Sequence, residues 1–138
     1  LLAILRTDQT FLNDEDKNYI PVGGIGELKQ TISYDSGLSW FPPKPTGIWG
    51  QPPHLIKLSN GSILLTYGFR KKPFGIKVAI SSCGKNNWRE IKTLRNDGLT
   101  WDLGYPCSLE LDNGKIITVY YFHDNDRIRN ISSTTWSL

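Results

Sequence analysis

The sequence predicts an all-β fold built from repeated antiparallel sheets. Long helical periodicity is absent from the chain, and short β-rich runs bounded by Gly, Asn and Pro take its place. Two of these runs, residues 53–69 and 106–122, share one plan: a strand, an Asn-Gly pair and a second strand. Because Asn-Gly tolerates the positive φ angles of a tight turn, each run is expected to form a β-hairpin.

The length and composition fit one small domain with its own core. The 138 residues are 38% hydrophobic and carry a net charge of +3, which does not indicate a nucleic-acid partner. No apolar run approaches the roughly 20 residues of a membrane span. Cys83 and Cys107 are in no metal-like spacing, so we expect two free, buried thiols and predict neither a metal nor a cofactor.

A second repeated element accompanies the hairpins. The stretch SYDSGLSW at 33–40 is echoed by SSCGKNNW at 81–88, which lies 48 residues later. Asn60 and Asn113 of the two hairpins are 53 residues apart. The repeating order is therefore a hairpin, a third strand, a turn with Trp and a fourth strand. Four strands in about 50 residues are typical of a β-propeller blade.

The two ends of the chain extend this repeat. The opening residues 1–6 (LLAILR) align with 65–70 (LTYGFR) as the second strand of a hairpin, and the tail 131–136 (ISSTTW) places Trp136 with the Trp of the turn. The chain should hold about 2.5–3 blades, with ends near 1–45, 46–100 and 101–138, in a partial propeller.

The chain has no Met, starts inside a blade and shows no signal peptide, which predicts a piece of a longer protein and leaves its compartment open. Natural propellers close with four to eight blades. Either further blades exist, or copies of this chain associate into a homo-oligomer that completes the ring; two copies would supply about six blades.

The stretch 33–40 resembles the Asp-box, or BNR repeat, of sialidases (neuraminidases), through Ser33, Asp35, Gly37 and Trp40. The segments 50–81 and 101–122 resemble the C-terminal half of bacterial sialidase-like propellers. In that family the Asp-box is a turn away from the active site. Physical chemistry agrees, since a short Asp side chain can accept bonds from its own turn and Gly permits a positive φ angle. We therefore expect Asp35 to be structural, with its Trp between neighbouring blades.

The hairpin plan predicts which end of the molecule carries chemistry. The Asn-Gly turns and the Asp-box should share one end, here called the turn end. The opposite end, here called the site end, should collect the starts of first strands and the ends of second strands. The residues expected there are His54, Tyr105, Arg6, Arg70 and His123. Two guanidinium groups at the same end of the molecule, from Arg6 and Arg70, suit a carboxylate ligand.

The family resemblance gives these residues roles. Arg6 and Arg70 resemble the second and third members of the Arg triad that clamps the carboxylate of sialic acid, and Tyr105 resembles the nucleophilic Tyr, which is known among glycosidases from sialidases. The alternatives are a salt bridge for each Arg and a buried aromatic for Tyr105. His54 either contacts the glycan or serves packing and hydrogen bonding. Asp102 either orients a group at the site end or caps the turn beside it, and His123 is a weaker candidate.

Several family residues have no matched position in this chain. The resemblance places the first Arg, the acid/base Asp and the Glu partner of the Tyr before Leu1. The insertion at about 7–27, acidic and then Gly-rich, should lie at the site end, either as a lid or interaction loop or as a solvated loop. Three hypotheses follow: an exo-α-sialidase-like hydrolase, a non-catalytic module that binds an acidic glycan, and an assembly protein that completes a ring.

Overall fold

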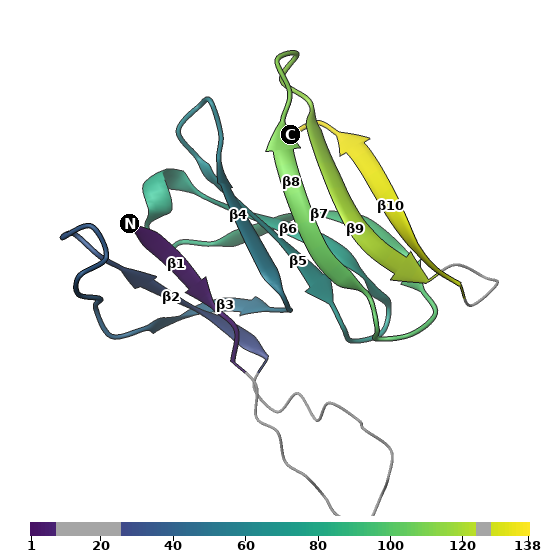
Figure 1. The fold of residues 1–138 in the computed structure, drawn as a ribbon, viewed down its shortest axis with the longest axis horizontal. Helices are drawn as coiled ribbons and strands as arrows, with labels where there is room; N and C mark the ends of the chain where they lie inside the picture. The colour runs from purple at the N-terminus through teal and green to yellow at the C-terminus, as the bar shows by residue number, and fades with distance from the viewer. Residues whose placement is uncertain (8–25, 124–127) are drawn as a thin grey trace, which may run out of the picture.

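The chain forms an all-β fold of three antiparallel sheets (Figure 1). The structure is a computed structural model, and it describes residues 1–7, 26–123 and 128–138. Within these residues the helical structure is limited to the short turn η1 (Ser82–Gly84). The predicted fold class is confirmed, with three sheets arranged as in part of a propeller.

Each sheet follows the chain order without crossovers. The first sheet has three strands, the second has four, and the third has three. The last strand of the first sheet ends at Trp49, past the boundary expected near residue 45. The strands are β1 (Leu2–Leu5), β2 (Glu27–Ile32) and β3 (Lys44–Trp49); β4 (Pro53–Lys57), β5 (Ile63–Phe69), β6 (Phe74–Ser81) and β7 (Arg89–Gly98); and β8 (Gly104–Glu110), β9 (Ile116–His123) and β10 (Arg129–Trp136).

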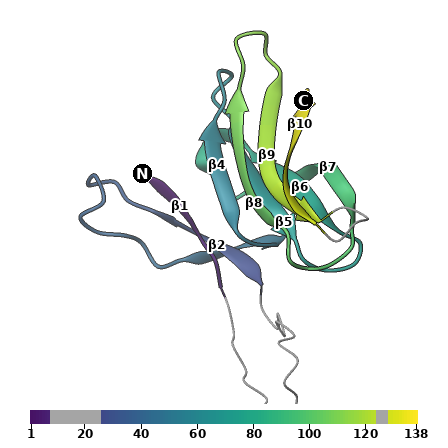
Figure 2. The same cartoon turned by 45° about the vertical axis from the view of Figure 1, so that its right-hand side comes forward.

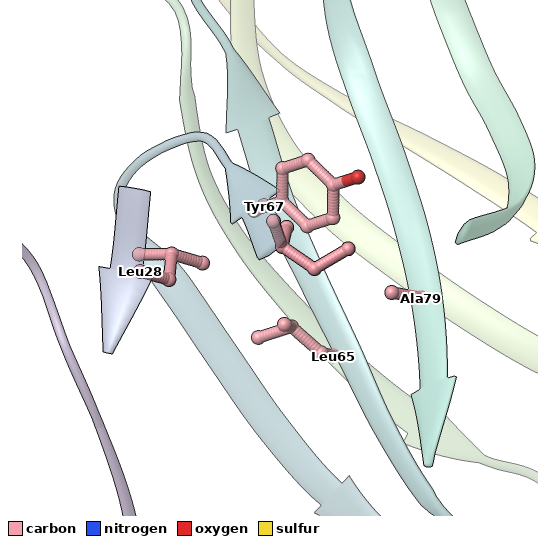
Figure 3. Packing of buried hydrophobic residues seen from close by; sticks show 5 residues of the cluster. Leu28, Leu65, Tyr67 and Ala79 are labelled. Atoms are coloured by element: carbon pink, nitrogen blue, oxygen red, sulfur yellow. The ribbon is translucent and has the colours of Figure 1, made fainter. Parts of the chain in front are cut away.

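The second sheet lies between the other two and is buried on both faces. Leu65, Tyr67 and Ala79 point toward the first sheet and pack against Leu28 and Ile48 (Figure 3). The alternate residues of the same strands face the third sheet, where Leu64 and Val78 pack with Ile116 and Trp136. This period-2 alternation follows from strand geometry, which sends successive side chains to opposite faces.

The turns and the strand ends separate as the hairpin plan predicts. In Figure 1 the β4–β5 and β8–β9 turns and the C-terminus lie toward the upper edge. The ends of β5 and β9 and the starts of β4 and β8 lie at the opposite end, and Figure 2 shows the same separation from a second direction. The turn end and the site end are therefore distinct ends of one molecule.

Strand pairing corrects the expected alignment of Arg6. Leu5 pairs with Lys29, whereas Tyr67 pairs with Lys77, 48 residues beyond Lys29. Leu5 is thus the counterpart of Tyr67, and Arg6 corresponds to Gly68 rather than to Arg70. The two-residue shift preserves the alternation, so the apolar pattern of the sequence could not reveal it.

The alignment of Trp136 is also corrected. Trp136 pairs with Ile116, just as Ser81 pairs with Ile63 in the second sheet. It therefore occupies the place of the serine that ends the third strand, not the place of the Trp after the turn. Its ring is buried between the second and third sheets, and its indole nitrogen donates to the Thr118 hydroxyl at 3.1 Å.

Two further expectations, the packing of Trp40 and the burial of Cys107, are not met within the described residues. Trp40 is exposed, although Trp88 in the equivalent turn packs between the first and second sheets. Cys107 is a free thiol, as expected, but it is exposed rather than buried. Among the described residues, no sheet covers the side of the first sheet near Trp40 or the side of the third sheet that carries Cys107.

Candidate functional site

Arg70 is the centre of the candidate site. Its Nε donates a hydrogen bond to the Leu103 carbonyl at 3.1 Å. The guanidinium carbon lies 5.7 Å from the centre of the Trp101 ring and 6.0 Å from the centre of the Tyr105 ring. Within the described part of the chain, no acceptor is bonded to the two terminal nitrogens of Arg70. The head group is thus fixed in place while its strongest donors remain available for an anion.

A close backbone approach joins the two sheets at this point. A Cβ atom on Gly68, near the end of β5, would lie 3.2 Å from the Cα of Gly104, where β8 begins, and 2.6 Å from the Gln51 carbonyl oxygen. Gly104 has a φ angle of +125°, which favours glycine. These two glycines let the strands approach, and the approach brings Arg70 beside Tyr105.

Tyr105 is presented to solvent by an irregularity in the third sheet. Gly104 pairs with Tyr121 and Cys107 pairs with Val119, so two residues of β8 face one residue of β9, as in a β-bulge. Tyr105 has a φ angle of +48°, which costs a non-glycine residue about 1–2 kcal/mol. Its side chain is exposed. Strained residues of this kind cluster at functional sites, which favours the functional role over a buried aromatic.

Asp102 joins two side chains beside Tyr105. One carboxylate oxygen accepts a hydrogen bond from the Tyr121 hydroxyl at 2.6 Å, and the other accepts one from Arg129 Nε at 2.8 Å. The Tyr121 ring lies 5.8 Å from the Tyr105 ring, centre to centre. Asp102 therefore orients Tyr121 at the site end, and its carboxylate bonds are to these side chains rather than to the backbone of its turn.

The same network shifts the pKa values of its members. The hydrogen bond from Tyr121 and the charge of Arg129 hold the pKa of Asp102 below its usual value. Burial and the bond to Asp102 raise the pKa of Tyr121 to about 12. At neutral pH Asp102 is therefore an ionised acceptor and not a proton donor, and Tyr121 is a neutral phenol.

His54 belongs to a separate contact between the second and third sheets. Its Nδ1 accepts a hydrogen bond from the Ser108 backbone at 3.2 Å, and its Nε2 lies 3.5 Å from the Cys107 sulfur. Burial lowers the pKa of His54, so the ring is neutral at pH 7. These contacts correspond to the packing and hydrogen-bonding alternative rather than to a free ring that faces a ligand.

Unpaired buried polar atoms concentrate at the site end. In the described residues, buried side-chain nitrogen or oxygen atoms without a hydrogen-bond partner belong to Trp49, Gln51 and His123. Trp49 ends β3, Gln51 precedes β4 and His123 ends β9, and all three strand ends lie at the site end. Buried polar groups are normally satisfied, so these three residues distinguish the site end from the rest of the described chain.

Arg6 lies just past the end of β1, exposed, on the first sheet. It lies at the same end of the molecule as Arg70. Its position in the repeat corresponds to Gly68, two residues before Arg70. The acidic and Gly-rich insertion, with Asp14, Glu15 and Asp16, lies outside the described residues apart from its edges.

Three side chains that contact Arg70, Asp102 or Tyr105 were not predicted: Trp101, Tyr121 and Arg129. Tyr121 could have been found from the 53-residue repeat, because it replaces Gly68, and a change from Gly to Tyr at a strand end marks altered surroundings. Arg129 had no such signal, since its bond to Asp102 joins residues 27 positions apart.

Residues 33–40 form a hydrogen-bonded turn at the turn end. The Asp35 carboxylate accepts bonds from the Ser39 backbone at 2.9 Å and from the Ser33 hydroxyl at 2.7 Å, and the Gly37 backbone donates to the Ser33 hydroxyl at 2.8 Å. Gly37 has a φ angle of +94°. Asp35 thus bonds to its own turn, away from Arg70 and Tyr105.

Replacing Asp35 with Ala should lower the stability of the protein at neutral pH. Hydrogen bonds from the Ser39 side chain and backbone lower the pKa of Asp35 from 3.8, so its stabilising effect is present above pH 3.8 and is lost as the pH falls toward the depressed value. The difference in unfolding free energy between wild type and variant should shrink as the pH falls below 3.8. Urea denaturation from pH 7 to pH 2 measures it, and a constant difference would contradict this role.

The described residues were also searched for metal-binding clusters and for membrane-spanning helices. They contain no group of three or more His, Cys, Asp or Glu side chains that could hold a metal ion. No helix among them is long and apolar enough to cross a membrane.

Comparison with known proteins finds a structural neighbour of unknown function. No protein-family model matches the chain, and no curated protein matches it. It is similar to the crystal structure of an unknown-function protein from Dyadobacter fermentans DSM 18053, with 32% sequence identity and a TM-score of 0.75. The match covers 81% of this chain and 31% of that protein, so the chain corresponds to about a third of the neighbour's length.

Proposed function

We propose that the site end binds the carboxylate of an acidic sugar through Arg70, as part of a sialidase-like glycoside hydrolase that acts on terminal sialic acid or a related sugar. The observation that carries the proposal is the Arg70 head group, held by the Leu103 carbonyl with both terminal nitrogens unbonded within the described residues. A planar fork of two donors matches the two oxygens of a carboxylate.

The surroundings of Arg70 suit the rest of such a ligand. Trp101 and Tyr105 offer aromatic surface near the guanidinium group, and the Tyr105 side chain is exposed. The aromatic contacts also hold the cation without neutralising its charge. A sugar carboxylate at Arg70 would therefore place the sugar ring within reach of the Tyr105 hydroxyl.

In the proposed reaction Tyr105 is the nucleophile. Its phenol oxygen forms a bond to the anomeric carbon as the bond to the leaving oxygen breaks, a base takes the phenol proton, and an acid protonates the leaving oxygen. Water then hydrolyses the covalent intermediate. Residues 1–138 supply no matched acid or base for these steps, so the full reaction is proposed for a protein or an assembly that provides them.

Binding without turnover is the second candidate function. It is favoured by Asp102, because this carboxylate beside Tyr105 already accepts bonds from Tyr121 and Arg129 and has a lowered pKa. An ionised carboxylate engaged in this way cannot serve as the acid. In this case the chain would hold an acidic glycan through Arg70 as a non-catalytic module.

Replacing Tyr105 with Phe separates the two candidates. In a protein or assembly that supplies the acid and the base, loss of the nucleophile should lower the release of a fluorescent aglycone from a sialoside by several orders of magnitude. Sialic acid binding should persist, because the phenyl ring keeps the contacts with Arg70 and Tyr121. If wild type and variant are equally inert while sialic acid still binds, the binding module is the correct function. If neither activity nor binding is found, both candidates are wrong.

A further inference from the structure

A tyrosine occupies a glycine position at the site end of the third sheet. Tyr121 holds the place in β9 that Gly68 holds in β5, 53 residues earlier. Gly68 has no room for a side chain, because a Cβ atom there would lie 2.6 Å from the Gln51 carbonyl oxygen. In the third sheet the same place carries a half-buried phenol ring. This ring therefore belongs to the sheet that presents Tyr105 and has no counterpart in the second sheet.

Tyr121 contacts residues on both sides of Gly104, where β8 begins. Its hydroxyl donates to one Asp102 oxygen at 2.6 Å, and its ring centre lies 5.8 Å from that of Tyr105, with the two planes 33° apart. Arg129 Nε donates to the other Asp102 oxygen at 2.8 Å, so the carboxylate is itself held from a separate strand. The hydrogen bond fixes one end of the Tyr121 ring, which makes this ring a fixed surface beside Tyr105.

The ring of Tyr105 is held by its neighbours and not by burial. The residue is 60% exposed, and within the part of the chain that the structure describes no hydrogen bond holds its hydroxyl. The neighbours of the ring are the guanidinium carbon of Arg70 at 6.0 Å and the Tyr121 ring at 5.8 Å. An exposed side chain without such neighbours is free to change its χ1 rotamer. Tyr121 thus restricts Tyr105 to the rotamer that lies beside Arg70.

We propose that Tyr121 is a positioning residue, which keeps Tyr105 beside Arg70. Asp102 and Arg129 hold Tyr121 in the orientation that this role requires. Burial and the bond to Asp102 raise the pKa of Tyr121, and the positive charge of Arg70 opposes them, so the phenol is close enough to Arg70 to respond to its charge. The part of the inference that concerns a bound carboxylate rests on the proposed function, whereas the hold on Tyr105 does not.

Replacing Tyr121 with Leu tests this role in the full chain. Leucine keeps an apolar side chain in the strand but loses the ring contact and the bond to Asp102. The affinity for sialic acid, measured by isothermal titration calorimetry, should fall about threefold to tenfold, the range expected for the loss of an aromatic pair. Tyr34→Leu is the matched control. The Tyr34 ring contacts Phe41 at 5.7 Å at the turn end, so the same change there should leave the affinity unchanged.

A double-mutant cycle distinguishes positioning from general support of the fold. If Tyr121 acts through Tyr105, Tyr121→Leu should cause no further loss of affinity in a chain that already carries Tyr105→Leu. An equal loss in both backgrounds would mean that Tyr121 only supports the sheet, and the proposal would be wrong. An unchanged affinity in Tyr121→Leu alone, while wild type binds sialic acid, would also overturn it.

The position of the Tyr105 ring can be followed without any ligand. NMR of the full chain with isotope-labelled tyrosine rings gives a signal for Tyr105, which is assigned by its loss in Tyr105→Phe. The Tyr121 ring should displace this signal from that of a solvent-exposed tyrosine, and Tyr121→Leu should return it toward the exposed value. Tyr121→Phe disturbs the strand less and loses only the bond to Asp102, so the signal should move in the same direction by a smaller amount. An unchanged Tyr105 signal in Tyr121→Phe would overturn the proposal.

The two measurements separate failure of this inference from failure of the proposed function. If wild type does not bind sialic acid, the proposed function is wrong, and the Tyr105 signal alone decides whether Tyr121 positions that ring. If Arg70→Ala removes binding while Tyr121→Leu changes neither the affinity nor the Tyr105 signal, the proposed function stands and this inference is wrong.

Discussion

Replacing Arg70 with Ala is expected to weaken the binding of sialic acid by about a hundredfold or more. The Arg70 fork would lose two charge-assisted hydrogen bonds to the sugar carboxylate, each worth about 1.5–3 kcal/mol, and 1.4 kcal/mol corresponds to about a tenfold change in affinity. Arg70→Lys should recover only part of the loss, since an ammonium group keeps the charge but not the planar fork. Isothermal titration calorimetry measures both variants.

Arg89 provides a matched control for this experiment. It lies at the start of β7 and is exposed, so Arg89→Ala removes the same net charge away from the candidate site. Its affinity for sialic acid should equal that of wild type. An Arg70→Ala variant that binds as well as Arg89→Ala would show that the carboxylate is not held by Arg70, and the proposed site would then be wrong.

Replacing Phe122 with Ala should cost about 3–5 kcal/mol of unfolding free energy. Phe122 is 1% exposed and packs with Ile76, Leu103 and Tyr120, between the second and third sheets. Truncation leaves a cavity beside the β9 end that carries His123, so the site end loses support as well. Urea denaturation gives the free energy, and a small domain has only about 5–15 kcal/mol in total.

Phe41→Ala is the corresponding control. Phe41 is 58% exposed, and its ring contact is with Tyr34 at 5.7 Å. This truncation should cost less than about 1 kcal/mol, because most of the lost surface already faces water. Equal losses for the two phenylalanines would mean that the packing between the second and third sheets contributes little to stability.

The end of the molecule at which the candidate site residues lie could be predicted from the sequence, because it depends only on the direction of each strand. The Asn-Gly turns orient the four strands of the two hairpins, and this orientation brings Arg70, Asp102 and Tyr105 to one end. The contacts among them were not predictable. The bond from Arg70 to the Leu103 carbonyl depends on the approach of Gly68 to Gly104, and the bonds of Asp102 to Tyr121 and Arg129 join three separate segments of the chain.

The sequence by itself determined the all-β class, the two Asn-Gly hairpins, the repeat and the separation of the turn at 33–40 from the site end. Each of these depends on local backbone preferences and on alternation along a strand, which nearby residues encode. Tertiary structure decided the place of Arg6, because a shift by two residues leaves alternation unchanged. It also placed Trp136 at the end of the third strand rather than after the turn. It also decided which apolar faces are covered. Leu28, Ile76 and Ile131 look alike in the sequence, and they differ only in whether a neighbouring sheet packs against them.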